Sequence, residues 1–320
     1  MRHATSVDRA APGVRHEALF YSGAAEYVAG TVPFVLDGLA AGEDVLVVVG
    51  QERAEQMHAA LGGQAASVQF ADMAEVGHNP AQIIPAWQEF LDDRTARGRP
   101  VRGIGEPIWA ARTPAELIEC QRHEALLNVA FADSPRWRLL CPYDVETLRS
   151  DVLAEAVRTH PYVITGGVRR AVGVDVDEMA VQYLDVPLPE PTRVIDEAAF
   201  DRRGLRHVRT LVASTAERFG MDPARTADLV VAVNEVTTNS VTHAGGQGHL
   251  RLWRDGRSLV CEVCDRGRLD EPLAGRRRPP AGSLGGRGLW LANQLCDLVQ
   301  IRCYESGTVV RLHMGITTLP

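Results

Sequence analysis

The chain contains no lysine, so every one of its 34 basic residues is an arginine. This absence excludes a lysine Schiff base. It also excludes a standard P-loop, in which a lysine follows the glycine-rich turn. A nucleotide bound by this chain would have to be held by arginine, by backbone amides and by a metal ion.

Long apolar runs are missing as well. No stretch reaches the roughly eighteen apolar residues of a membrane-spanning helix, so no span is expected. Residues 1–15 lack the apolar centre of a secretory signal. These two absences predict a cytoplasmic protein whose six cysteines are reduced thiols. Cys261 and Cys264 resemble half a zinc site, but they lie in an alternating strand pattern with no second pair after them, so we interpret them as core residues.

An excess of positive charge is also absent. The net charge is −7, whereas binding to a phosphate backbone requires clustered positive charge, so nucleic acid is not expected as a partner. The one dense basic run is the three arginines at residues 276–278. Two prolines follow this run, and we interpret it as a solvated surface loop.

Residues 15–165 alternate between strand and helix patterns. Residues 45–50 form a continuous apolar run, which is typical of a strand buried on both faces. Helical periodicity appears in residues 24–41, 114–130 and 145–158, among others. Strands separated by helices predict an α/β fold with a mostly parallel sheet covered on both faces. Residues 51–55, after the buried strand, contain neither glycine nor lysine, so nucleotide hydrolysis is not expected in this half.

The periodicity fades between residues 165 and 192. Gly166-Gly167 and three later prolines predict a linker, and a boundary near residue 180 gives domains at residues 12–180 and 190–320. In the second domain, Asp222-Pro223 predicts the cap and first turn of a helix that runs to about residue 243. Strand and helix patterns there predict an α+β sandwich with helices on one face of a mixed sheet.

The most informative stretch is residues 234–244. Glu235 and Asn239 stand four residues apart in a helical pattern, so they share one face about one turn from each other. Magnesium takes few protein oxygens, so the amide oxygen of Asn239 is a candidate Mg²⁺ ligand. Glu235 is then the candidate general base for an attacking hydroxyl. His243, one turn further along, is either a third site residue or a core or cap residue.

Two later motifs point to a nucleotide. Asp265 ends an apolar strand, where its carboxylate can accept a hydrogen bond from the adenine amine, and Gly267 would let the backbone approach the ring. An ordinary strand-end turn is the alternative. A glycine-rich run then opens an apolar helix, whose free amides favour phosphate, with flexible linkage as the alternative. The residues of this run are Gly285, Gly286, Arg287 and Gly288, and the arginine could replace the missing lysine.

Over residues 195–318, these pieces together resemble the ATP site of the GHKL superfamily (gyrase, histidine kinase, MutL), in its anti-sigma-factor serine kinase branch. Residues 235–243 look like the N box of that branch, residues 265–267 like its first glycine box and residues 286–289 like its second. Gly307-Thr308 resembles the Gly-Thr motif of the last strand, whose hydroxyl lies near adenine in the family. The resemblance implies that ATP and Mg²⁺ bind at Asn239, His243, Asp265, Gly267, Gly285, Gly286, Arg287, Gly288, Leu289 and Thr308.

A histidine kinase is the alternative within the same superfamily. His207 lies in a segment similar to a phospho-acceptor box, but only one helix separates it from residues 235–243, where a two-helix hairpin would be required. We therefore interpret His207 as an ordinary residue of the first helix, and we expect a serine or threonine of a partner as acceptor. In the first glycine box, Leu269 replaces the second glycine of the family.

The first half carries looser motifs. His16-x-x-x-Phe20-Tyr21, Gly103-x-Gly105-Glu106 and the run at residues 141–144 resemble the MEDS sensory domain, a degenerate RecA relative proposed to sense small organic ligands. The resemblance covers residues 12–165 and implies a RecA-like α/β fold. The candidate ligand-binding residues, expected at strand ends, are His16, Glu106, Cys141, Tyr143 and Asp144. Helix or turn caps are the alternative for Glu106 and Asp144.

The two resemblances together imply a signalling switch. In it, a domain that senses a small-molecule ligand controls an ATP-dependent serine/threonine kinase, whose partner would be an anti-anti-sigma factor, a sigma factor or both. The alternative is a binding module that sequesters its partner and uses ATP only structurally. A third hypothesis is an ATPase whose lid drives formation of a homodimer. An intact Glu235 favours the kinase.

Overall fold

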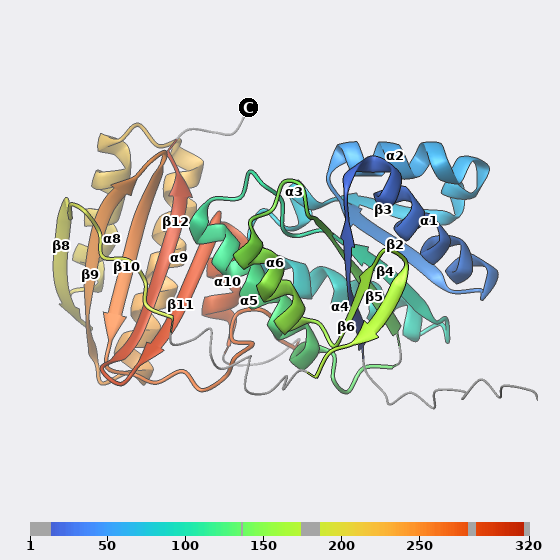
Figure 1. Ribbon diagram of the computed structural model, residues 1–320. Coiled ribbons are helices and arrows are strands. Elements are labelled where there is room, and N and C mark those ends of the chain that lie inside the picture. The colour runs from blue at the N-terminus through green and yellow to red at the C-terminus, as the bar shows by residue number, and fades with distance from the viewer. Residues whose placement is uncertain (1–13, 136, 174–185, 281–285, 317–320) are drawn as a thin grey trace, which may run out of the picture. The chain divides into compact units, whose positions relative to one another are not determined.

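A computed structural model describes residues 14–135, 137–173, 186–280 and 286–316 (Figure 1). These residues form two compact units. The first comprises residues 14–72, 90–109 and 127–173, and the second comprises the remaining described residues. Helices α4 (Ile83–Thr95) and α5 (Pro114–Ala130) contribute residues to both units.

The first unit is built on a seven-stranded sheet in the order β3-β2-β4-β5-β1-β6-β7. Neighbouring strands pair in parallel except β6 and β7, so the predicted mostly parallel sheet is confirmed. The strands are β1 (Val14–Tyr21), β2 (Asp44–Val49), β3 (Val68–Asp72), β4 (Val101–Gly105), β5 (Trp137–Asp144), β6 (Tyr162–Thr165) and β7 (Val168–Ala171). Its helices include α1 (Gly23–Ala40), α2 (Gln51–Leu61), α6 (Ser150–Thr159) and the 3-10 helix η1 (Gly62–Ser67).

Two local predictions for the first unit were wrong. Gly166 and Gly167 form the turn of the β6–β7 hairpin rather than the start of a linker, and both have positive φ, as a tight two-residue hairpin turn requires. The helix expected from residue 145 begins only at Ser150. The Asp144 carboxylate accepts a hydrogen bond from the amide of Glu146 at 3.0 Å, a turn that competes with helix formation.

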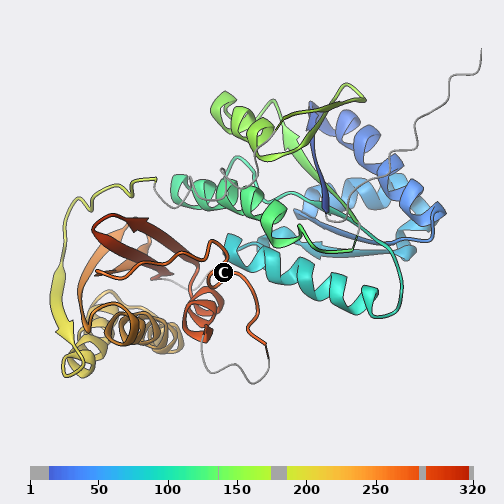
Figure 2. The same ribbon diagram turned by 90° about the horizontal axis from the view of Figure 1, so that it is seen from below.

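The second unit contains a five-stranded sheet in the order β11-β12-β10-β9-β8. All of its pairings are antiparallel, so the expected mixed sheet was wrong. Figures 1 and 2 show helices α8, α9 and α10 against one face of this sheet. The elements are β8 (Asp196–Asp201), α8 (Leu205–Arg218), α9 (Pro223–His243), β9 (Gln247–Asp255), β10 (Ser258–Asp265), α10 (Arg287–Leu295), β11 (Leu298–Tyr304) and β12 (Gly307–Gly315), together with α3 (Met73–Val76) and the 3-10 helix η2 (Pro80–Gln82).

Helix α9 is fixed at both ends by local chemistry. The Asp222 carboxylate accepts from the amides of Ala224 and Arg225, and Pro223 occupies the first turn, as predicted. Gly245 and Gly246, both with positive φ, follow the last turn. Between these ends the buried positions recur at helical spacing, namely Thr226, Leu229, Ala232, Val233, Val236, Thr237 and Ser240.

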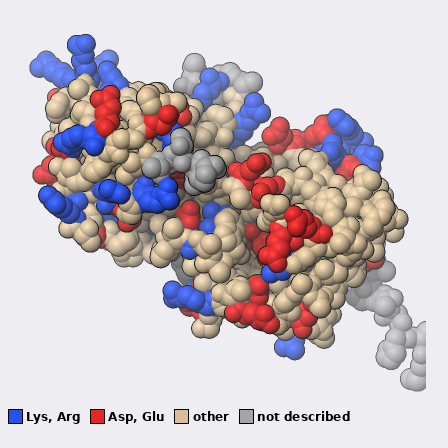
Figure 3. Space-filling view, turned by 90° about the horizontal axis from the view of Figure 1, so that it is seen from above, with Lys and Arg blue, Asp and Glu red and all other residues tan. Residues whose placement is uncertain are grey.

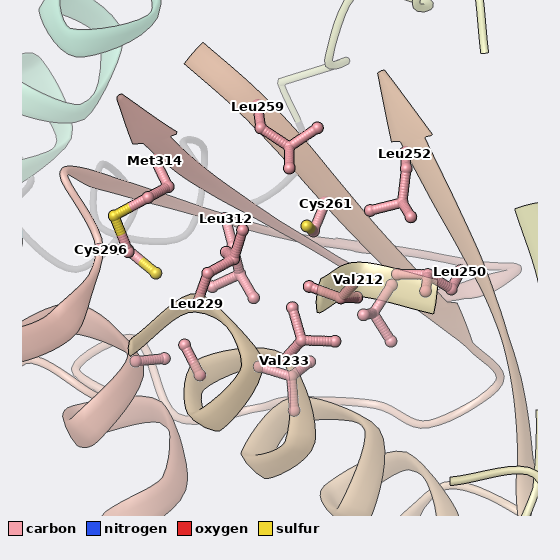
Figure 4. Packing of buried hydrophobic residues seen from close by; sticks show 14 of the residues in the cluster. Val212, Leu229, Val233, Leu250, Leu252, Leu259, Cys261, Cys296, Leu312 and Met314 are labelled. Carbon is pink, nitrogen blue, oxygen red and sulfur yellow. The ribbon is translucent and has the colours of Figure 1, made fainter. Parts of the chain in front are cut away.

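The core of the second unit lies between these helices and the sheet. In Figure 4, Val212 of α8 and Leu229 and Val233 of α9 approach the apolar side chains of the sheet strands. The sheet side chains labelled there are Leu250, Leu252, Leu259, Cys261, Leu312 and Met314. Each such Leu or Val contributes on the order of 1.5–3 kcal/mol of transfer free energy. Cys261 is fully buried in this core, as predicted, whereas Cys264 is half-buried.

The surface carries charges of both signs. Because the chain has no lysine, all basic side chains in Figure 3 are arginines, and on this face they form separate groups with acidic side chains between them. Among the described residues, no helix is long and apolar enough to cross a membrane.

Candidate functional site

Glu235 and Asn239 lie one turn apart on α9, both half-buried, and the start of α10 lies against them. A Cβ added at Gly288 would lie 2.9 Å from Asn239 Nδ2 and 3.2 Å from Glu235 Oε2. Only a residue without a side chain permits so close an approach without displacing these groups. The structure therefore brings Glu235, Asn239 and Gly288 together.

The Asp265 carboxylate is held between two elements. One oxygen accepts from Ser240 Oγ at 2.6 Å, and the other accepts from the Gly267 amide at 2.8 Å. The Gly267 carbonyl in turn accepts from Thr308 Oγ1 at 2.9 Å. A Cβ at Gly267 would come within 2.5 Å of the Ala244 side chain, so glycine is required for this packing. The end of β10 is thereby fixed between α9 and β12.

These residues surround a cavity of about 400 Å³. This volume falls in the range of small-molecule sites. The predicted residues that line it are Asn239, His243, Asp265, Gly267, Gly286, Gly288, Leu289 and Thr308. His243 is exposed at the cavity edge rather than in the core, and Leu269 also lines the cavity. The cavity thus has a polar wall from α9 and β10 and an apolar wall from Leu269 and Leu289.

The remaining predicted residues lie outside the cavity lining. Glu235 stands beside the cavity, next to Asn239 and Gly288. Arg287 is exposed and does not line the cavity. Gly285 lies outside the described residues.

Several residues at the site were not assigned from the sequence. Ser240 directly follows Asn239, and its role appears only through its bond to Asp265. Gly275 has φ +73, and a Cβ there would lie 2.9 Å from the Leu289 side chain. The sequence did not single out Gly275, because it lies in a loop with many glycines and prolines. The other unassigned lining residues are Val236, Ala244, Arg268, Glu271, Ala274 and Val310.

Arg276, next to Gly275, is buried, so the interpretation of residues 276–278 as a solvated loop was wrong at this position. Its guanidinium contacts the Glu119 carboxylate at 2.9 Å, within the second unit. The same carboxylate contacts Arg302 at 2.8 Å and Arg122 at 3.5 Å. Burial opposes ionisation of Glu119, yet the three guanidiniums lower its pKa below the ordinary value.

The sensor candidates of the first unit separate into two groups. Glu106 and Asp144 stand at the carboxyl ends of β4 and β5 and are linked through two other side chains. Tyr21 Oη donates to Glu106 at 2.8 Å, and Arg53 contacts Asp144 at 3.1 Å. Arg53 also lies over the Tyr21 ring, 5.1 Å from its centroid. This linked set is at the sheet edge where parallel α/β sheets bind ligands.

The raised pKa of the buried Glu106 carboxyl group leads us to expect that the stability of the protein depends on pH. Burial raises its pKa from 4.5 to about 7, against the opposing effects of Tyr21 and Arg53. The folded state then binds more protons than the unfolded state between these values, so stability falls as pH rises through this window, by roughly 3 kcal/mol for this group. Urea denaturation measured at several pH values between 4.5 and 8 checks this. The free energy of unfolding of Glu106→Gln should fall less over this range than that of wild type. Glu55→Gln, at an exposed position of α2, should keep the wild-type dependence of unfolding free energy on pH. If the unfolding free energies of Glu106→Gln and wild type changed equally with pH, Glu106 would not be the source of the dependence.

His16, Cys141 and Tyr143 form the second group. His16 Nε2 lies 3.2 Å from Cys141 Sγ, and both residues are buried. The Tyr143 ring meets the His160 ring edge-on at 5.5 Å between centroids. His160 was not singled out from the sequence, because nothing near it in the chain marks a site.

Two family models match separate parts of the chain. Residues 15–161 match the family model described as the MEthanogen/methylotroph, DcmR Sensory domain (MEDS). Residues 198–314 match the family model of the histidine kinase-like ATPase domain. A comparison with curated proteins finds no match.

Among solved structures, the crystal structure of the RsbU and RsbW domains of Rv1364c from Mycobacterium tuberculosis matches with 20% sequence identity and a TM-score of 0.28. The match covers 38% of this chain and 32% of that chain, so this chain spans about a third of its length. On the two family matches, the chain carries a MEDS sensory domain followed by a histidine kinase-like ATPase domain of the GHKL type.

Proposed function

We propose that the chain is a signalling switch in which a sensory domain, residues 12–180, controls an ATP-binding domain, residues 190–320. The first domain is a RecA-like α/β domain that binds a small-molecule ligand. The second is a protein serine/threonine kinase of the anti-sigma-factor type, which phosphorylates an anti-anti-sigma partner in the cytoplasm. The N-box and glycine-box motifs of residues 235–289 and the match to an ATPase family support this proposal.

The observation that carries the proposal is the meeting of three separate segments at one cavity. Asn239 of α9, Asp265 of β10 and Gly288 of α10 line the same space of about 400 Å³. A Cβ at Gly288 would press on both Glu235 and Asn239, which leaves backbone amides of α10 next to these side chains. A helix N-terminus favours a phosphate group through these amides and the helix dipole.

The residues present fit ATP and Mg²⁺. Asn239 offers an amide oxygen, the kind of ligand that Mg²⁺ accepts alongside phosphate oxygens and water. Asp265 is fixed by Ser240 and by the Gly267 amide, so its position as an acceptor for the adenine amine does not depend on a flexible side chain. Bound Mg²⁺ would neutralise phosphate charge.

Glu235 is the proposed general base. Its carboxylate lies beside Gly288, which lines the cavity in the first turn of α10. In this role it accepts the proton of a partner hydroxyl while the phosphoryl group of ATP is transferred. The products are then a phosphorylated partner and ADP.

The second candidate function is a non-catalytic ATP-binding module that sequesters its partner. Leu269 supports this alternative, because it replaces the second glycine of the first glycine box and packs against the core of the second unit while lining the cavity. A packed leucine restricts the backbone motion that a glycine would allow.

Incubation of the full-length protein with γ-labelled ATP and candidate partners that contain an acceptor serine distinguishes the two. Transfer of label to a partner supports the kinase. ATP binding without transfer to any partner supports the binding module.

A further inference from the structure

His16, Cys141 and His160 converge within the first unit, although they are far apart in the sequence. His16 lies on β1, Cys141 on β5 and His160 directly after α6. His16 and His160 are 0% exposed and Cys141 is 1% exposed. Their ligand atoms lie within 4.8 Å of one another. We propose that these three side chains bind a divalent transition-metal ion of the zinc class.

The spacing of the atoms supports this assignment. His16 Nε2 lies 3.2 Å from Cys141 Sγ. In a tetrahedral zinc site with Zn–N of about 2.0 Å and Zn–S of about 2.3 Å, the two ligand atoms are about 3.5 Å apart. The two imidazole rings also lie close, at 3.9 Å between centroids. The His16–Cys141 pair is therefore within a few tenths of an ångström of the spacing that coordination requires.

The hydrogen bonds fix the orientation of His16. Asn128 donates through Nδ2 to the Thr159 carbonyl at 2.9 Å, which identifies its other terminal atom as the acceptor oxygen. That oxygen lies 3.2 Å from His16 Nδ1, so the proton of the neutral ring is on Nδ1. The lone pair of Nε2 then points to Cys141, as in a metal-binding histidine held by a carbonyl acceptor.

His160 shows the same arrangement. Its Nδ1 lies 2.8 Å from the Ala156 carbonyl, which can only accept, so Nδ1 carries the proton and Nε2 carries the lone pair. In both rings Nδ1 faces an acceptor oxygen, so Nε2 carries the lone pair in the neutral ring, the form in which imidazole binds a metal. Two imidazoles and a thiolate are the donors that favour zinc and related ions over Mg²⁺ or Ca²⁺.

The proposed binding is balanced in protons. Cys141 loses its thiol proton to become a thiolate, and the two imidazoles bind as neutral rings. One proton is therefore released for each metal ion bound. The three proposed ligands belong to the first unit, whereas the residues of the proposed ATP site belong to the second.

The test uses the full-length protein treated with a chelator and then titrated with Zn²⁺ and with Co²⁺. We expect one equivalent of either ion per chain, release of one proton, and a thiolate-to-cobalt charge-transfer band. Cys141→Ser should lose the band, whereas Cys264→Ser, which removes a thiol of the second unit, should keep it. Asn128→Leu removes the acceptor for His16 and should weaken Zn²⁺ binding by about 10- to 100-fold.

Two results would overturn the proposal. One is a folded wild-type protein that binds neither Zn²⁺ nor Co²⁺, or whose Co²⁺ spectrum lacks the thiolate band. The other is equal affinity and an unchanged spectrum in Cys141→Ser, which would place the metal elsewhere. Circular dichroism and thermal unfolding of each variant show whether it is folded, and the wild-type spectrum decides the matter if the variants are not.

Discussion

Replacement of Glu235 by glutamine should lower the rate of phosphoryl transfer to the partner by about 10²- to 10⁴-fold, the usual contribution of a general base. Glutamine has nearly the same shape, so the contact with Gly288 and the fold should be kept, while the ability to accept a proton is lost. Affinity for Mg-ATP should change little. The measurement is single-turnover transfer of labelled phosphate with saturating ATP.

Glu217→Gln is the matched control for this experiment. Glu217 is an exposed carboxylate on α8 of the same unit, and its replacement should leave the transfer rate unchanged. A Glu235→Gln protein that transfers phosphate at the wild-type rate would show that Glu235 is not the base.

The second large effect is expected at Glu119. Replacement by glutamine leaves Arg122, Arg276 and Arg302 buried without their counter-charge. Removing one partner of a buried ion pair costs about 3–5 kcal/mol. Urea denaturation at pH 7 should therefore show a loss of unfolding free energy of this size. Because the pKa of Glu119 is lowered in the folded state, the carboxylate contributes stability above its unfolded pKa, and this is lost as pH falls.

Glu305→Gln, at an exposed position of the same unit, should change the free energy of unfolding by no more than about 0.5 kcal/mol. If Glu119→Gln were as stable as this control, the buried charge cluster would not be a stabilising feature of the second unit. Titration of the Glu119 variant with ATP would then show whether its nucleotide affinity is kept. Arg276 directly follows the cavity residue Gly275, so a displaced Arg276 would change this affinity.

Local chemistry explains what the sequence predicted well. The Asp222-Pro223 cap and the glycines after residue 243 define α9 without reference to any other element, so the shared face of Glu235 and Asn239 followed from spacing alone. The bounds of α5, residues 114–130, were likewise predicted from periodicity and turn residues.

Long-range contacts explain what it did not. Strand β8 was missed because it is a short edge strand with exposed acidic residues, and it forms only by pairing with β9. Arg276 was placed on the surface because its partner Glu119 lies 157 positions earlier in the chain. His160 carries no motif, and its meeting with His16 depends on the pairing of β1 with β6. In each case the decisive partner is distant in sequence.

The most direct test of the proposed ATP site is the effect of Mg²⁺ on ATP affinity, measured by calorimetric titration of the protein with ATP in the presence of Mg²⁺ or of a chelator. We expect Mg²⁺ to tighten ATP binding to wild type and to Thr238→Ala, which alters the residue beside Asn239. Asn239→Ala should largely lose this tightening. A wild-type protein that binds no ATP, or an Asn239→Ala protein that keeps the full Mg²⁺ effect, would contradict the proposed site.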